Sequence, residues 1–184
     1  MRHEMLRNIS WFYVAFVVVN FMVMLWYLIS GYLTISTGLP LPYFMLYIPS
    51  NLMAAGIISY IMTLTLYAYL GIALIKSWFL RGMIPISFSA ALVGELLSFL
   101  LGQYIIAEMF LIVIMITEIG TYITLASIAA NKVSRILWSI DAVISIIMTI
   151  ISNVMYAYVS YLSSISISLA ILACTMDFWM YTRY

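Results

Sequence analysis

Residues 94–108, GELLSFLLGQYIIAE, place a Gly-Gln pair between two long apolar runs, with an acid on each side of the pair. A connection this short only reverses the chain, so the flanking runs form neighbouring antiparallel helices. At about 1.5 Å of rise per residue, Glu95 and Glu108 lie at depths that agree within about 3 Å. This stretch therefore predicts a helical hairpin with two acids near its tip.

The whole chain is too apolar for a water-soluble domain. Of its 184 residues, 67% are hydrophobic and 7% are charged, whereas soluble domains average about 45–50% and about 25%. A fold of this size cannot hide so much apolar surface from water, so lipid surrounds most of the chain. We expect a single membrane domain over residues 1–184, located in the cell membrane.

Apolar stretches long enough to cross a bilayer recur along the sequence. A helix needs about 20 apolar residues to cross a hydrocarbon core of about 30 Å. We therefore expect an all-α bundle of six transmembrane helices over residues 9–33, 50–75, 83–101, 104–130, 135–158 and 162–182. The one long connection, residues 34–49, is either a surface loop with interfacial anchors or a lid over an outward-facing cavity.

The positive charges predict how these spans are oriented. All seven fall before, after or between spans in a way that puts them on one side of the membrane: Arg2, Arg7, Lys76, Arg81, Lys132, Arg135 and Arg183. Cytoplasmic loops carry an excess of Lys and Arg, so we expect both termini to be cytoplasmic. Tryptophans close to these basic residues predict an aromatic belt at the same interface: Trp11, Trp78, Trp138 and Trp179.

The residue types that are scarce exclude several kinds of chemistry. Cys174 and His3 are the only cysteine and histidine, so no intrachain disulfide forms. Zinc, haem and iron–sulfur sites need more ligands than these two residues supply, and we expect no cofactor. The sequence does not predict a particular metal. A net charge of +1 without a basic patch argues against a nucleic-acid partner.

Ionisable side chains within the spans are the first candidates for a functional site, because they are costly in lipid. No Lys or Arg shares the depth of Glu95, Glu108 or Glu118. These acids are therefore protonated, bind a cation or a cationic ligand, face water or contact a partner subunit. We predict a ligand or ion site that joins them to nearby neutral oxygens: Glu95, Ser98, Gln103, Glu108, Glu118 and Thr121.

Further polar stripes follow single helix faces. The longest comprises Asp141, Ser145, Thr149 and Asn153, and shorter ones comprise Gly56, Ser59 and Thr63, and Ser160, Ser164 and Ser168. Such stripes either pack helices together or contribute to a site. For Asp141 we expect an ion pair with Lys132 or Arg135, and for Asp177 a contact with Arg183 or solvent.

These features favour a membrane protein that binds or translocates a cation, a proton or a small solute through in-membrane carboxylates. The alternative is a non-catalytic subunit of a larger respiratory or transporter assembly. An intramembrane enzyme that uses the carboxylates as acid and base on a lipid is less favoured, because no phosphate-binding or metal-binding motif is present. The expected partners are the bilayer, other membrane subunits or further copies of the chain.

Overall fold

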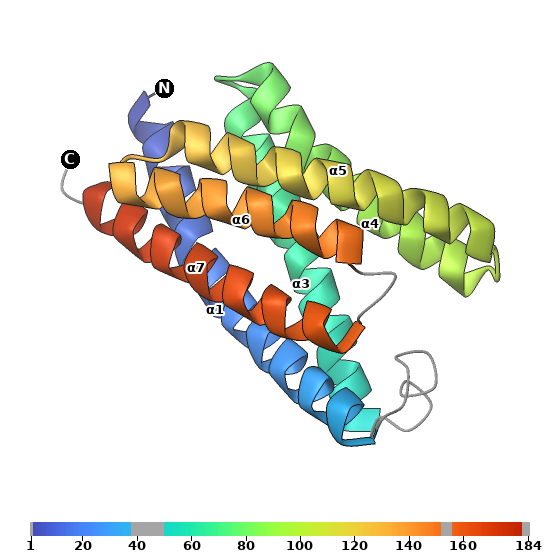
Figure 1. The fold of residues 1–184 in the computed structure, drawn as a ribbon. Coiled ribbons are helices and arrows are strands. Elements are labelled where there is room, and N and C mark those ends of the chain that lie inside the picture. Colours follow the sequence, from blue (N-terminus) through green and yellow to red (C-terminus); the bar gives the residue numbers. More distant parts are fainter. Residues whose placement is uncertain (1, 38–49, 152–155, 182–184) are drawn as a thin grey trace.

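The computed structural model describes residues 2–37, 50–151 and 156–181, and every element within them is a helix. The helices are α1 (Arg2–Thr37), α3 (Ser50–Ile75), α4 (Phe79–Leu100), α5 (Tyr104–Ile128), α6 (Lys132–Ile151) and α7 (Tyr156–Tyr181) (Figure 1). Five of them contain segments long and apolar enough to cross a membrane. In α1, which has 36 residues, the described apolar stretch is the shorter Ile9–Leu25. The predicted all-helical, multi-pass membrane architecture is thus confirmed, while the sixth span and the orientation of the termini stay predictions.

The helices form a closed ring. Each packs against the helices before and after it in the chain, and α1 closes the ring by packing against α7 (Figure 1). Successive helices alternate in direction, so α1 and α7 are also antiparallel. The described start of α1 and the end of α7 therefore lie at the same end of the bundle.

The two ends of the ring differ in charge. Residues 76–78 join α3 to α4 and residues 129–131 join α5 to α6, and both turns lie at the end where α1 starts (Figure 1). We call this the basic end, because its turns and the helices leaving them carry four basic residues: Lys76, Arg81, Lys132 and Arg135. The turn at residues 101–103 lies at the opposite end, which we call the hairpin end.

The predicted hairpin is present, and α4 ends in a Schellman motif at its turn. Gly102 has a φ of 70°, in the left-handed region that glycine adopts without a steric penalty. The backbone N–H of Gln103 donates to the carbonyl of Ser98 at 2.8 Å, which satisfies an oxygen at the end of α4. The sequence Gly102-Gln103 therefore ends one helix and starts the next within a few residues.

Some predicted helix boundaries are wrong. The turn expected at residues 159–161 lies inside α7, and α6 ends at Ile151 instead of at 158. No Gly or Pro interrupts residues 156–162, and the Ser and Tyr residues there continue a helix at small cost. Residues 34–37 belong to α1, while the rest of the predicted loop, residues 38–49, lies outside the described residues.

Two glycines let α3 and α4 approach each other closely near the basic end. A Cβ on Gly82 would lie 2.6 Å from the backbone nitrogen of Ile75 and 2.7 Å from the carbonyl oxygen of Gly71. Small residues at helix interfaces allow such backbone contact in membranes. The position of α4 beside α3 therefore depends on the absence of a side chain at residue 82.

A carboxylate of α7 closes the turn between α5 and α6. Asp177 is fully buried, and its Oδ1 accepts hydrogen bonds from the backbone N–H groups of Ala130 at 3.1 Å and Asn131 at 3.2 Å. The Ser134 hydroxyl donates to the same oxygen. Both N–H groups lie in the connection just before α6, where no helical carbonyl is their partner, so Asp177 supplies an acceptor from α7. Its predicted contact with solvent is wrong, and Arg183 lies outside the described residues.

Aromatic side chains fill the ring near the basic end. The ring centroids of Phe16 and Trp138 lie 5.6 Å apart, and Tyr122 stacks on Trp138 at 5.9 Å. Trp138 has no exposed surface, so its predicted place in an interfacial belt is wrong. Trp138 lies one turn after the fully buried Ser134, on the face of α6 that points into the ring, and is therefore buried with it. The other three tryptophans of the predicted belt are exposed: Trp11, Trp78 and Trp179.

Candidate functional site

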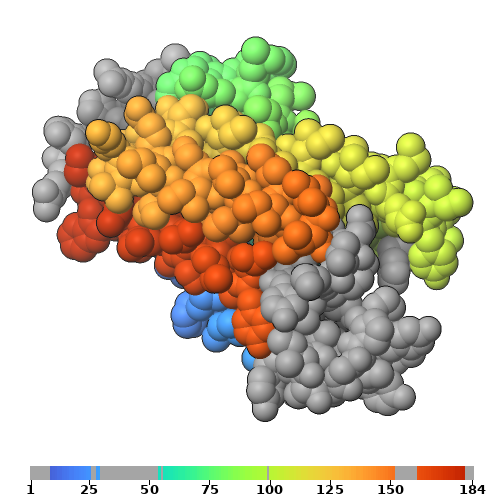
Figure 2. All heavy atoms as spheres, viewed as in Figure 1, coloured from blue at the N-terminus to red at the C-terminus, as the bar shows by residue number. Residues whose placement is uncertain are grey.

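A cavity of about 280 Å³ lies inside the ring, between the aromatic cluster and the hairpin end. All six helices contribute to its wall, and α6 and α7 form the side seen in front in Figure 2. Its size is close to the lower limit of about 300 Å³ for small-molecule pockets. Many of the side chains in its wall are polar: Asn20, Ser59, Tyr60, Thr63, Tyr67, Glu118, Tyr122, Ser163 and Ser166.

The polar wall follows from helical spacing in a membrane. On α3, Ser59 and Thr63 lie one turn apart, and the Thr63 hydroxyl donates to the Ser59 carbonyl at 2.8 Å. On α6, the residues with the least exposure include Asp141 and Ser145, whereas Ile140 and Ile147 are exposed. These polar side chains of α3 and α6 face the interior of the ring, while the two isoleucines face outwards, as the cost of polar groups in lipid favours.

Glu118 is the one acid among the described residues that line the cavity. It lies near the middle of α5, and its Oε1 accepts a hydrogen bond from the Tyr122 hydroxyl at 3.3 Å. None of the described lining residues is a Lys, Arg or His. The sequence prediction that Glu118 has no basic partner is consistent with this wall.

Asp141 lies behind the cavity wall and contacts it through a hydroxyl. The Ser166 hydroxyl, which lines the cavity, donates to Asp141 Oδ1 at 2.9 Å. Asp141 is fully buried, and its Oδ2 has no hydrogen-bond partner among the described residues. The predicted ion pair with Lys132 or Arg135 is wrong, because both basic side chains are exposed at the basic end. Lys132 lies two and a half turns before Asp141 at about 3.6 residues per turn, hence on the opposite side of α6.

Glu95 contacts the cavity through Tyr60 of α3. The Tyr60 hydroxyl lies 2.8 Å from Glu95 Oε2 and 2.8 Å from the Leu92 carbonyl oxygen. A hydroxyl carries one proton, so it donates to one of these acceptors at a time. Both contacts are hydrogen bonds together only when Glu95 also carries a proton and donates it to Tyr60. Tyr60 and Leu92 line the cavity, and Glu95 lies about one turn further towards the hairpin end.

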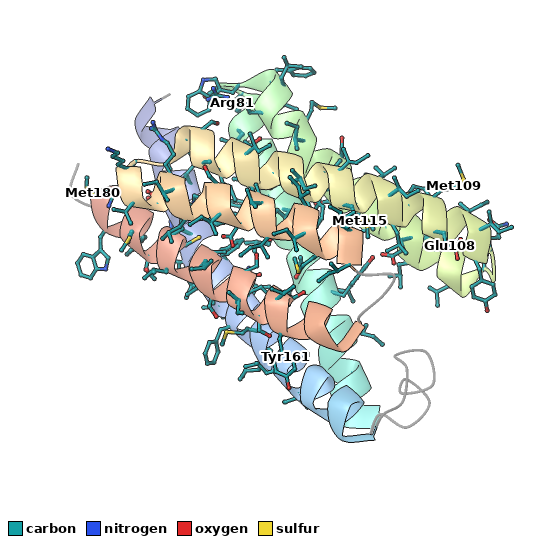
Figure 3. The ribbon with its side chains drawn as sticks, viewed as in Figure 1. Arg81, Glu108, Met109, Met115, Tyr161 and Met180 are labelled. Atoms are coloured by element: carbon teal, nitrogen blue, oxygen red, sulfur yellow. The ribbon has the colours of Figure 1, made fainter. Side chains whose placement is uncertain are left out.

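The remaining predicted site residues lie elsewhere. Glu108 is exposed on the hairpin (Figure 3), and Gln103 is exposed at the start of α5 without a side-chain capping bond. Ser98 is buried away from the cavity lining, and the buried Thr121 donates to the Thr117 carbonyl at 2.7 Å. Glu95 and Glu108 therefore do not share a site. The Glu95 side chain contacts α3, whereas the Glu108 side chain lies on the molecular surface.

The second predicted stripe is only partly described. Ser145 is buried one turn beyond Asp141, and its hydroxyl has no hydrogen-bond partner among the described residues. The half-buried Thr149 donates to the Ser145 carbonyl at 2.8 Å. Asn153 lies outside the described residues. The described part of the stripe faces inwards, next to the cavity and outside its lining.

Several lining residues were not singled out from the sequence: Asn20, Tyr60, Tyr67, Tyr122, Ser163 and Ser166. Ser163 and Ser166 lie three residues apart and could have indicated an inward face of α7. The serines at 160, 164 and 168 indicate a different face equally well. Hydroxyl residues this frequent do not identify which face of α7 points inwards.

The described residues contain no group of three or more His, Cys, Asp or Glu side chains placed to hold a metal ion. What the site offers is a carboxylate, several hydroxyls and aromatic rings around one cavity. Comparison of the chain with family models, curated proteins and solved structures finds no match among them.

Proposed function

We propose that this protein binds a small cationic solute or a proton in its central cavity and moves it across the cell membrane. The observation that carries the proposal is Glu118, an acid in the wall of a cavity whose described lining contains no basic residue. Lys and Arg side chains lie instead at the basic end, which we propose to be cytoplasmic together with both termini.

The Glu118 carboxylate is costly when it is charged and has no positive partner. A carboxylate away from bulk water is strongly disfavoured unless a proton or a cation neutralises it. Among the described residues, Glu118 accepts a hydrogen bond from the Tyr122 hydroxyl, and that contact is long at 3.3 Å. A ligand that supplies a positive charge therefore gains from binding there, and its departure requires a proton in its place.

The ring supplies a route by which the cavity communicates with the membrane surfaces. Towards the hairpin end, Tyr60 lines the cavity, and Glu95, which contacts it, lies about one turn further along. Towards the basic end, the aromatic cluster around Trp138 separates the cavity from the turns. Movement of a solute requires the cavity to be accessible from one end of the ring at a time, which is the ordinary requirement of alternating access.

The proposal is tested with purified protein reconstituted into liposomes. Uptake of monovalent cations and of protons is followed with fluorescent indicators under an imposed gradient. We expect the Glu118→Gln variant to lose gradient-dependent uptake, because the amide cannot exchange a proton for a cation. The matched control is Glu108→Gln, which removes the same charge from the exposed hairpin and should transport as the wild type does. Undiminished uptake by Glu118→Gln would contradict the proposal.

A role as a subunit of a larger membrane complex is the second candidate, and Glu108 favours it. This exposed acid lies on a hairpin whose tip exposes large apolar side chains, including Leu101 at 72% and Ile105 at 78%. A neighbouring chain can supply a partner for such an acid more readily than lipid can. Light scattering of the gently extracted protein checks this, and a monodisperse particle of one chain would count against it.

A further inference from the structure

Resting on the proposed function, we propose that the cavity ligand is a small protonated amine, an organic ammonium ion that carries N–H donors. The proposed function states that a cation binds, and its chemical class is what is inferred now. It depends on the size of the cavity, the hydrogen-bonding state of its wall, its charge and its aromatic rings.

The size of the cavity favours an organic solute over a bare ion. Its volume is about 280 Å³, whereas a cavity of about 150 Å³ already holds a benzene molecule. Binding a bare hard cation of the Ca²⁺ or Mg²⁺ class requires about six to eight oxygen ligands close around it. The lining supplies one carboxylate, and the described residues hold no cluster of three or more acidic, His or Cys ligands.

Three Ser and Thr hydroxyls in the wall already donate their protons to protein acceptors. A serine or threonine hydroxyl has one proton to donate and two lone pairs that accept. Three lining hydroxyls donate within the protein, Thr63 to the Ser59 carbonyl at 2.8 Å, Ser163 to the Met148 sulfur at 3.2 Å and Ser166 to Asp141 Oδ1 at 2.9 Å. Their lone pairs are what remains for a ligand. This part of the wall therefore accepts hydrogen bonds and does not donate them.

Two further lining residues add to this acceptor character. The Asn20 side-chain nitrogen donates one of its two N–H groups to the Phe16 carbonyl at 3.0 Å, which leaves the amide oxygen as an acceptor beside the second N–H. Glu118 Oε1 accepts the hydrogen bond from the Tyr122 hydroxyl, so Oε2 is the oxygen available to a ligand. An N–H-bearing cation satisfies both the charge and the acceptors, whereas an anion satisfies neither.

Aromatic rings in the same wall suit the carbon part of an ammonium ion. Tyr67 and Phe88 both line the cavity, and their ring centroids lie 4.8 Å apart in an edge-to-face arrangement. Aromatic faces attract organic cations and also provide an apolar surface for alkyl groups. The wall thus combines an acceptor-rich part with an apolar part, which matches a primary alkylammonium ion.

The test uses isothermal titration calorimetry on the purified full-length protein in detergent, with three probes at equal ionic strength. The probes are n-butylammonium, tetramethylammonium and sodium. The first two have the same charge and the same number of heavy atoms, but only n-butylammonium has N–H donors. We expect n-butylammonium to bind saturably and tetramethylammonium to bind at least about tenfold more weakly, because the wall acceptors are then left unpaired.

Variants assign the binding to this cavity. Glu118→Gln should lose n-butylammonium binding, and Glu108→Gln should retain it. Thr63→Val, which removes one acceptor and keeps the side-chain shape, should weaken n-butylammonium by several-fold and leave tetramethylammonium unchanged. The comparison of the two ammonium probes needs no variant, so a substitution that fails to fold does not affect it.

The outcomes separate this inference from the proposed function. Equal or tighter binding of tetramethylammonium would overturn the inference that N–H donors are recognised. Glu118-dependent binding of sodium without binding of n-butylammonium would also overturn it, while the proposed cation site would stand. If none of the probes binds and liposomes show no Glu118-dependent flux, both the inference and the proposed function are wrong.

Discussion

At the scale of the residue, the acids of this chain have different roles because their surroundings differ. Glu118 lines a cavity, Asp141 bonds to a hydroxyl that lines it, and Asp177 bonds to a helix start. Glu108 is exposed on the hairpin. The same carboxyl group is thus a ligand candidate, a supporting contact, a cap or a surface charge, according to which donors its helix face meets.

The Asp177 contacts predict a loss of stability on substitution. Asp177→Ala leaves the N–H groups of Ala130 and Asn131 and the Ser134 hydroxyl without their acceptor. A buried donor without a partner costs about 1–3 kcal/mol, so we expect the free energy of unfolding to fall by about 3 kcal/mol. Denaturant-induced unfolding in detergent measures the difference.

Glu108→Ala is the control for this prediction. It removes an exposed acid and should change the unfolding free energy by no more than about 0.5 kcal/mol. Equal stability of Asp177→Ala and the wild type would mean that the α5–α6 turn does not depend on α7.

Sequence reasoning found the unusual residues but not their neighbours. Glu118 was identified because an acid without a basic residue at its depth is conspicuous in an apolar span. The predicted set also included Glu108 and Gln103, which lie outside the cavity lining, since depth along a helix is readable from the sequence while rotation about its axis is not. The rotation of α4 and α5 is set by packing against α3 and α6. The rotation of each helix therefore depends on residues throughout the bundle and cannot be read from one segment.

At the scale of the element, glycine decides how α3 and α4 meet. Gly82→Ala would place a Cβ against the α3 backbone at Gly71 and Ile75, which cannot move as a side-chain end can. Overpacking of this kind costs about 1–3 kcal/mol, and occasionally more. We expect a corresponding loss of thermal stability in detergent, with α4 displaced from α3.

Gly102→Ala provides a useful contrast to Gly82→Ala. Nothing lies within 4 Å of a Cβ at Gly102, but its φ of 70° disfavours any side chain. The expected cost is about 1–2 kcal/mol from backbone conformation alone. A Gly82→Ala variant as stable as the wild type would show that the two helices do not need their close approach.

Helix positions were predictable to the extent that lipid imposes them. Each apolar stretch found in the sequence overlaps a helix of the structure, because a segment in lipid must satisfy its own backbone hydrogen bonds. Ends were predicted well where a glycine marks them, as at Gly102. They were misplaced between α6 and α7, where neither Gly nor Pro marks the end of a helix.

At the scale of the whole molecule, the closed ring explains why a cavity exists at all. The six described helices pack edge to edge, and none of them occupies the centre, so among the described residues only side chains fill the interior. Large aromatic residues occupy the part near the basic end. Serine, threonine and glycine occupy much of the rest of the α3 and α7 faces, and their small volume leaves the space open.

The orientation of the ring is open to a direct measurement. Single substitutions Ser77→Cys and Gln103→Cys place a thiol at the basic end and at the hairpin end. The native Cys174 is fully buried and should contribute little labelling. With intact cells, a membrane-impermeant maleimide should modify Gln103→Cys and not Ser77→Cys. The reverse pattern would place the basic end outside.

The bond between Asp177 and the α5–α6 turn also bears on biosynthesis. Residues 129–131 leave the ribosome well before Asp177 does, so their N–H groups lack this acceptor until α7 has been made. α1, which precedes the other described helices in the chain, likewise gains its second neighbour only when α7 is present. Until α7 has been made, the cavity therefore lacks the part of its wall that Ser163, Ser166 and Ile167 supply.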